Sequence, residues 1–185
     1  MKAADLNLQQ ALRFEPQNGM LKLGDSRVVL MGTEAIGALY QELINVGDTI
    51  GAQVVMRRFG DANGRERARM VKETLLPEDK MEWLAFGPAL HAWEGVGLPK
   101  LAGFEYDLAA SKFHLGVEFF NTYLAEQYLR VLGPATEPVC WQLAGYIAGY
   151  CSVVFDMDLH CRETKCVAKG DAHCEFHTRP RMEWL

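Results

Sequence analysis

The sequence RETKCVAKGDAHC, residues 162–174, places two cysteines eight positions apart around a Lys-Gly-Asp turn. The flanking residues predict one strand over 159–168 and another over 173–178. Such a hairpin would bring Cys166 and Cys174 within reach of one metal ion. The spacing is neither Cys-x-x-Cys nor that of a zinc finger. Buried cysteines that act as small apolar side chains are therefore an equally weighted alternative.

A helix predicted over residues 139–155 contributes two more cysteines. Cys140 and Cys151 lie eleven positions apart, which puts them on the same face of a helix. The helical rise nevertheless separates them by about 16 Å. They therefore cannot bind the same ion.

Strand geometry limits the other donors of the C-terminal hairpin. Cys161 and Cys166 are five positions apart and fall on opposite faces of a regular strand. Glu163 and Cys166 also fall on opposite faces. A site that uses both of these residues requires a β-bulge or the end of the strand.

Working outward from this stretch, apolar periodicity predicts the remaining elements. Short apolar runs interrupted by Asn-Gly and Gly-Asp predict two or three strands within residues 11–31. A β-hairpin is expected over 98–120, with its turn near 109–111 and one face made by Phe113, Leu115, Val117 and Phe119. Helices are expected over 34–59 with a break at Gly47 or Gly51, over 62–75, over 77–93 in two pieces separated at Gly87-Pro88, and over 123–132. This order predicts an α+β fold, in which helices pack on an antiparallel sheet.

The composition is that of an ordinary globular chain. Its 185 residues include 24 acidic and 19 basic side chains, for a formal charge of −5. Direct binding of nucleic acid is therefore not expected. The N-terminus has no apolar signal region, and no apolar run reaches the roughly 18 residues of a membrane span, so a cytoplasmic protein is expected. Phosphate-loop, dinucleotide and Gly-x-Ser-x-Gly motifs are absent, which favours a protein that is not an enzyme.

Several motifs resemble one known family. They are Glu-Pro-Val-Cys-Trp (137–141), Gly-Tyr-Ile-Ala-Gly-Tyr (145–150), Arg-Glu-Thr-Lys-Cys (162–166), Gly-Asp-Ala-His-Cys (170–174), Gly-Pro-Ala-Leu-His (87–91), Glu94-Gly95 and the stretch 113–121. Together they are similar to the 4-vinyl-reductase domain. More specifically, they resemble the N-terminal aromatic-effector sensor of sigma-54-dependent NtrC-class activators, the phenol- and xylene-responsive regulators. The resemblance extends from about residue 10 to Trp184.

The resemblance implies a structural zinc ion held by Cys140, Glu163, Cys166 and Cys174. A complete shell of this kind would pin helix 139–155 to the C-terminal hairpin and leave no open position for catalysis. Whether Cys161 takes the place of Glu163 stays open. The remaining histidines are expected at the surface rather than as ligands: His114, His160, His173 and His177.

The resemblance also implies an effector pocket. His91 matches a histidine that grips a phenolic hydroxyl in the sensor group. Phe119 stands where that group has a tryptophan, and a phenyl ring cannot donate the indole N–H hydrogen bond. This departure favours less polar aromatic effectors. The implied walls are Leu84, Val96, Val117, Phe119, Tyr146 and Tyr150, with Cys161 in place of an aromatic.

The function implied is a zinc-containing sensor that binds a small aromatic molecule and controls an AAA+ ATPase module outside this chain. Residues 1–31 are expected to form an N-terminal hairpin used for homodimerisation, 32–180 the sensor domain, and 181–185 a tail or the start of a linker. The alternatives are an enzyme or accessory protein in tetrapyrrole (vinyl) reduction, and a scaffold like the transport-particle subunits.

Overall fold

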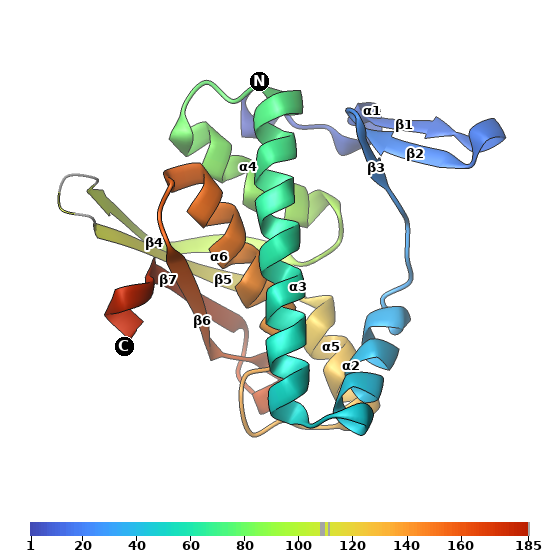
Figure 1. The fold of residues 1–185 in the computed structure, drawn as a ribbon, viewed down its shortest axis with the longest axis vertical. Coiled ribbons are helices and arrows are strands. Elements are labelled where there is room, and N and C mark those ends of the chain that lie inside the picture. Colours follow the sequence, from blue (N-terminus) through green and yellow to red (C-terminus); the bar gives the residue numbers. More distant parts are fainter. Residues whose placement is uncertain (108–109, 111, 185) are drawn as a thin grey trace.

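Four antiparallel strands form the central sheet of the computed structural model, which describes residues 1–107, 110 and 112–184 (Figure 1). Across the sheet they are β4 (Leu98–Asp107), β5 (Lys112–Phe120), β7 (Cys174–Pro180) and β6 (Leu159–Lys165). The predicted hairpin over 98–120 is confirmed. Of its predicted turn at 109–111, positions 109 and 111 lie outside the described residues.

Strand β5 separates two different environments. Phe113, Leu115 and Phe119 are buried on the face that meets the helices, whereas Glu118 is only half-buried. This is the alternation that the sequence predicts. Because β5 pairs with β4 on one side and β7 on the other, its inward side chains lie at the middle of the sheet.

Five helices of ten residues or more complete the described chain. They are α2 (Glu34–Val46), α3 (Thr49–Met70), α4 (Lys80–Trp93), α5 (Tyr123–Leu132) and α6 (Trp141–Phe155). Helix α6 is buried over almost its whole length, with α3 running alongside it (Figure 1). Within the described residues, none of the helices has both the length and the hydrophobicity that crossing a membrane requires.

Helices α3 and α6 approach each other closely enough for backbone contact. A Cβ atom added at Gly64 of α3 would overlap the carbonyl group of Tyr146, and one added at Gly145 of α6 would overlap that of Arg57. Only glycine permits this approach. Main-chain contact at these glycines therefore contributes to the packing of the two helices.

The expectation of separate helices over 34–59 and 62–75 is wrong. The break comes at Gly47, and α3 then runs without interruption from Thr49 to Met70. Asp48 caps the new helix, because its Oδ1 accepts a hydrogen bond from the Gly51 N–H at 2.6 Å. Gly60, which could have marked a break, is instead used for close packing against α6.

The expected separation at Gly87-Pro88 is also wrong, because α4 is continuous through Pro88. A proline inside a helix removes one backbone hydrogen bond but does not always end the helix. Gly87 lies against the ring of Tyr150, where an added Cβ would come within 3.3 Å of a ring carbon. Packing on α6 thus keeps this stretch helical.

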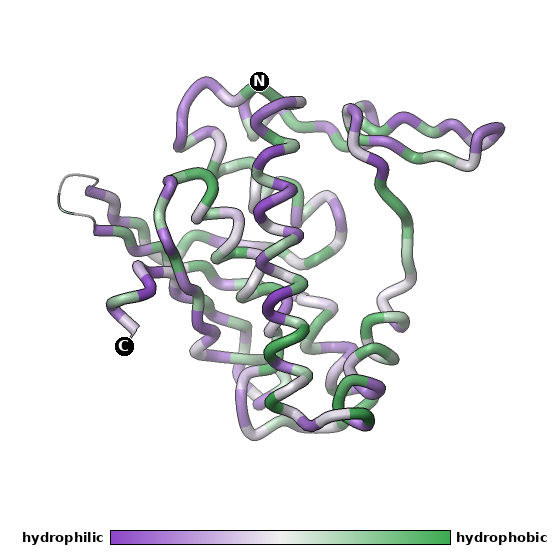
Figure 2. Tube along the Cα trace, viewed as in Figure 1, coloured by the Kyte–Doolittle hydropathy of each residue, from purple (hydrophilic) through white to green (hydrophobic). Residues whose placement is uncertain are grey.

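The N-terminal residues form a second, smaller sheet that projects from the body of the molecule (Figure 1). Its strands are β1 (Leu12–Glu15), β2 (Met20–Leu23) and β3 (Ser26–Val28), preceded by the short helix α1 (Leu8–Ala11). The segment from Val29 to Met31 then descends to α2 and is hydrophobic (Figure 2). Its three side chains are 60–80% exposed, an unusual state for consecutive apolar residues.

Candidate metal centre and apolar cavity

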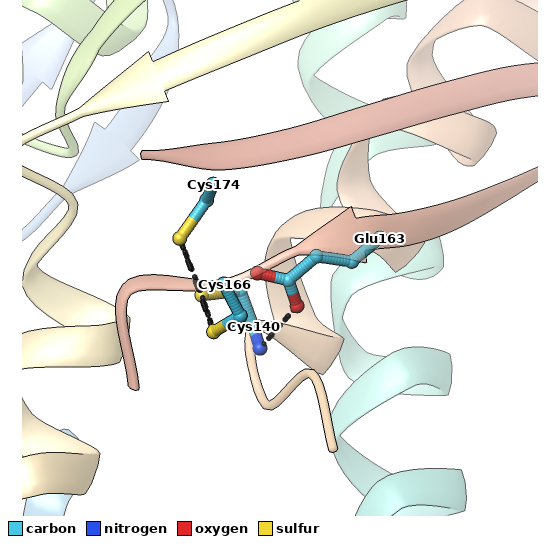
Figure 3. Close-up of side chains that lie close together, drawn as sticks. All are labelled: Cys140, Glu163, Cys166 and Cys174. Carbon is cyan, nitrogen blue, oxygen red and sulfur yellow. Dashed lines mark hydrogen bonds between the residues drawn. The ribbon is translucent and has the colours of Figure 1, made fainter. Parts of the chain in front are cut away.

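Three cysteines and one glutamate meet at the start of α6 (Figure 3). Cys140 directly precedes α6, Glu163 lies on β6, Cys166 follows β6, and Cys174 begins β7. The Sγ–Sγ distances are 4.0 Å for Cys140–Cys166, 3.7 Å for Cys140–Cys174 and 3.9 Å for Cys166–Cys174. A tetrahedral ion with sulfur ligands at about 2.3 Å would hold these atoms about 3.8 Å apart. The cluster therefore has the dimensions of a metal site.

A strand irregularity brings the carboxylate to the same side as the thiols. Glu163 pairs with Phe176, but Lys165 pairs with Glu175, so the register shifts between them. Strand β6 ends at Lys165, before the predicted limit of 168. The bulge and the early end place Glu163 and Cys166 side by side, which is the condition that the sequence predicted for using both.

Backbone hydrogen bonds hold the donors in place. Glu163 Oε2 accepts from the Cys140 N–H at 2.8 Å, and Asp171 Oδ2 accepts from the Cys166 N–H at 2.8 Å. The Val167 N–H donates to the Cys174 sulfur at 3.4 Å. Within the described part of the chain, the buried Glu163 Oε1 has no hydrogen-bond partner. A cation is the partner that would satisfy it.

The electrostatics of the cluster also favour a cation. Hydrogen bonds from the Cys140 and Cys174 thiols lower the pKa of Cys166, which favours its thiolate. Burial, together with that negative charge, raises the pKa of Glu163. Burial likewise raises the pKa of Cys140. A bound divalent ion would favour the deprotonated form of all of these groups. This set of residues could therefore hold a metal ion.

Cys161 is buried but does not belong to this cluster. It lies on β6 opposite Thr178, and burial raises the pKa of its thiol to about 12. Of the two alternatives for the fourth ligand, Glu163 is the residue that lies beside the three sulfurs.

A second feature is an apolar cavity of about 40 Å³ between α4, β5 and α6. Six of the predicted pocket residues line it: Leu84, His91, Val117, Phe119, Tyr146 and Tyr150. The Tyr150 hydroxyl donates to the Trp83 carbonyl oxygen at 2.6 Å, which fixes that ring. The cavity wall is therefore built from three separate elements that meet over the middle of the sheet.

Two predicted pocket residues do not line this cavity. Val96 follows the end of α4 and lines a different groove, together with Leu8 and Trp93. Cys161 lies on β6, and β7 separates that strand from β5 and Phe119. Both had been placed at the pocket by the family resemblance.

The cavity also contains residues that were not predicted: Gly87, Pro88, Leu115, Ile147 and Cys151. For two of these residues, the spacing in the sequence could have predicted a place in the cavity wall. Leu115 shares the alternating face of Val117 and Phe119, and Cys151 is one helical turn beyond Ile147. The others depend on how α4 packs against α6.

His91 and Tyr146 provide the polar groups of the cavity. Their ring centroids are 4.4 Å apart, and the His91 ring is 5.6 Å from that of Phe119. Burial and the nearby Arg67 lower the pKa of His91 to about 3, so its imidazole is neutral at pH 7. Arg67 pairs with Glu94 at 2.9 Å. The buried Tyr146 hydroxyl has no well-aligned partner among the residues described, although the Arg67 guanidinium is near it.

Comparison with known families identifies the family of the chain that carries both features. The family model described as "Activator of aromatic catabolism" matches residues 7–107, more than half of the chain. This chain belongs to that family. A second model, that of the 4-vinyl-reductase domain, matches residues 120–180, which include α6 and the cysteine cluster. The resemblance drawn from the sequence motifs is thereby confirmed.

Two curated relatives of this member of the activator family are longer proteins. It is 27% identical over 178 residues to the phenol regulator MopR of Acinetobacter guillouiae, a match that covers 96% of this chain and 32% of MopR. It is 25% identical over 178 residues to the transcriptional regulatory protein XylR of Pseudomonas putida, covering 96% and 31%. The chain thus spans about a third of the length of these regulators.

Solved structures match the activator-family fold as well. The phenol-responsive sensory domain of the transcription activator PoxR, crystallised with phenol, is 31% identical and gives a TM-score of 0.86 over 96% of this chain and 89% of that domain. This match confirms the α+β class. Subunit 3 of a trafficking protein particle complex from Naegleria fowleri is 14% identical, with a TM-score of 0.51 over 80% of this chain and 93% of that subunit. That likeness concerns the fold alone.

Proposed function

We propose that this chain is the effector-sensing domain of a transcription activator and that it binds a small aromatic molecule between α4, β5 and α6. The observation that carries the proposal is an apolar cavity with a neutral histidine in its wall. The chain that contains it is 31% identical to a sensory domain crystallised with phenol. Effector binding controls an AAA+ ATPase module that lies beyond the residues of this chain.

The effector is less polar than phenol or carries a larger hydrocarbon part. His91 and Tyr146 offer hydrogen bonds to a hydroxyl group, but Phe119 offers none. The other walls are apolar, among them Leu84, Val117 and Tyr150. Side chains in the wall move when the effector enters, because a cavity of about 40 Å³ is smaller than the roughly 150 Å³ that accommodates benzene.

Zinc is the metal that the cysteine cluster suits best. Three thiolates and one carboxylate form the closed, four-coordinate donor set of a structural zinc site. When bound, the ion supplies folding free energy by joining the start of α6 to the β6–β7 hairpin. Cys140, Glu163, Cys166 and Cys174 fill all four positions, so none remains for a substrate.

The regulator works as a cytoplasmic homodimer in this proposal. Residues 1–31 provide the dimer contact, residues 32–180 the sensor, and residues 181–185 a tail or the start of a linker. The exposed apolar segment Val29–Met31 supports the assignment of the dimer contact to residues 1–31. Direct contact with DNA belongs to another part of the activator, because this chain carries a formal charge of −5.

An enzymatic role in tetrapyrrole reduction is less well supported. The two curated relatives are regulators. The likeness to a trafficking-particle subunit extends to the fold only.

Calorimetry with phenol and toluene tests the effector site. We expect Phe119→Trp to restore an N–H donor and to raise the phenol-to-toluene affinity ratio by about fivefold, the net effect of one hydrogen bond of about 1 kcal/mol. The ratio is the useful quantity, because the larger side chain reduces the space for both ligands. His91→Ala should lower the same ratio.

Val96→Ala is the control, since Val96 lies outside the cavity. It should leave both affinities unchanged. If wild type, Phe119→Trp and His91→Ala all bind the two ligands with the same ratio, the aromatic molecule does not bind in this cavity.

A further inference from the structure

The outer face of the four-stranded sheet, opposite the helices, carries a group of side chains that the sensor function does not use. Glu118 on β5 and Glu175 on β7 lie directly opposite each other in the strand register. His173, just before β7, lies beside both of them. Two carboxylates in directly opposed positions repel each other, and this destabilises an antiparallel pair. The arrangement calls for a cation between the two strands.

The distances fit a metal ion better than a hydrogen bond. His173 Nε2 is 3.6 Å from Glu118 Oε1 and 3.7 Å from Glu175 Oε2, beyond the usual range of hydrogen bonds. A tetrahedral ion with nitrogen and oxygen ligands at about 2.0–2.1 Å would separate them by about 3.4 Å. One ligand atom from each of the three residues lies within 4.8 Å of the other two. The two distances from His173 exceed this separation by only a few tenths of an ångström.

The imidazole nitrogen that points at the two carboxylates has no other role in the described chain. His173 Nε2 is buried and lacks a hydrogen-bond partner there. The His173 ring rests on that of Phe120, with the centroids 5.3 Å apart, which fixes its orientation. A buried and unpaired ring nitrogen is costly, and a metal bond is one way to satisfy it.

Two further histidines orient one of the carboxylates. His177 Nε2 is 2.7 Å from Glu175 Oε1, and His114 Nε2 is 3.1 Å from His177 Nδ1. With one choice of histidine tautomers, His114 donates a hydrogen bond to His177, and His177 donates one to Glu175. Such hydrogen bonds behind a ligating carboxylate are typical of metal sites. They leave Glu175 Oε2 to face His173.

One cation already contacts this group and would compete with a metal. Lys165 Nζ is 2.7 Å from Glu175 Oε2, but its side chain is 50% exposed and free to turn toward water. Lys100 pairs in register with Glu118, yet its ammonium lies over the Phe120 ring, 4.5 Å from the centroid. Glu118 therefore has no lysine partner in the described residues.

We propose that Glu118, His173 and Glu175 form a second metal site, which binds a divalent first-row transition ion. The three side chains are 33%, 18% and 15% exposed, so water can reach the ion and complete its shell. One imidazole and two carboxylates suit Co²⁺, Mn²⁺ or Zn²⁺, whereas the three thiolates of the cysteine cluster favour zinc. The site links β5 to β7 from the side opposite Cys174, and it does not depend on aromatic binding.

Equilibrium dialysis against Co²⁺ tests this site on the whole chain. We expect about one cobalt ion per chain to bind at this site. Its spectrum should lack the thiolate-to-cobalt charge-transfer band in the near ultraviolet, and this absence distinguishes it from cobalt bound at the cysteines. Glu118→Gln and His173→Gln should each weaken this binding at least about tenfold. Glu126→Gln, on α5 and away from the sheet, should leave it unchanged.

A gain-of-binding variant provides an independent check. Lys165→Met removes the competing ammonium from Glu175 and should tighten cobalt binding, a result that a purely structural role of these residues would not give. The proposal is overturned if all the cobalt that wild type binds shows the thiolate-to-cobalt charge-transfer band, because that cobalt is at the cysteines. It is equally overturned if Glu118→Gln and His173→Gln bind cobalt as wild type does.

Discussion

At the scale of single residues, Cys166 connects the metal cluster to the backbone of the C-terminal hairpin. Its sulfur lies within 4.0 Å of two other sulfurs, and its N–H donates to Asp171. We expect the cysteine cluster of the purified protein to hold about one tightly bound zinc per chain, which remains after dialysis. Cys166→Ser should lose the zinc and then unfold or aggregate, because structural zinc contributes folding free energy directly. Metal analysis combined with thermal unfolding measures both effects.

The matched control is Cys161→Ser, which replaces a buried thiol on β6 that lies outside the cluster. It should retain the zinc of wild type. Soluble, folded wild-type protein without zinc would contradict the structural role of the metal.

His91 makes the stability of the fold depend on pH. Burial and Arg67 lower the pKa of this histidine to about 3 in the folded state, against about 6.5 when unfolded. Below pH 6.5 the unfolded chain therefore binds a proton that the folded chain does not. The stability present above pH 6.5 is lost as the pH falls toward 3. His91→Leu should reduce the loss in unfolding free energy between pH 7 and pH 5 by about 2 kcal/mol.

Urea unfolding at the two pH values measures this difference. Phe119→Leu changes a neighbouring wall of the same cavity without removing a titrating group. It should lower stability equally at both pH values and keep the pH dependence of wild type. A His91→Leu protein that loses as much stability as wild type would show that another group causes the acid sensitivity.

At the scale of elements, main-chain contact between α3 and α6 is the most demanding packing in the molecule. Gly64→Ala and Gly145→Ala would each force a methyl group onto a backbone carbonyl, so one helix would have to move. We expect each to lower the free energy of unfolding by about 3 kcal/mol or more. Gly103→Ala, on β4 with no atom within 4 Å of its added Cβ, should change it by less than about 0.5 kcal/mol. Denaturant titrations of the three variants compare the two environments, and equal effects would contradict the close approach.

The sequence predicts those elements whose structure follows from local hydrophobic periodicity. The alternation in β5, helix 123–132 and the need for a bulge between Glu163 and Cys166 all follow from periods of two and of 3.6 residues. The continuity of α3 and α4 was not predictable in this way. Gly60 and Pro88 are breakers by local rules, and only contact with α6 keeps their helices intact. The cavity lining similarly depends on the strand order, which placed Cys161 too far from Phe119.

At the scale of the whole molecule, the projecting N-terminal sheet leaves apolar surface without cover in one chain. Val29, Leu30 and Met31 are 76%, 80% and 60% exposed. We expect a homodimer at micromolar concentration in which a partner chain covers this segment. Leu30→Asp should shift the mass measured by light scattering to that of a monomer, because a buried carboxylate would lack a partner.

Leu101→Asp places the same charge on an exposed leucine of β4. It should leave the dimer intact. A monomeric wild type would contradict the proposed contact.

The two sides of α6 also differ in their tolerance of mutation. One side meets the backbone of α3 through Gly145 and Gly149, while Tyr146 and Tyr150 face the cavity. A library that varies α6 to change effector specificity would therefore lose many members to misfolding. Leu84 on α4, with Leu115 and Val117 on β5, reaches the same space from elements without such glycine contacts to α3. Directed evolution of the sensor toward a new aromatic compound should begin at these three codons.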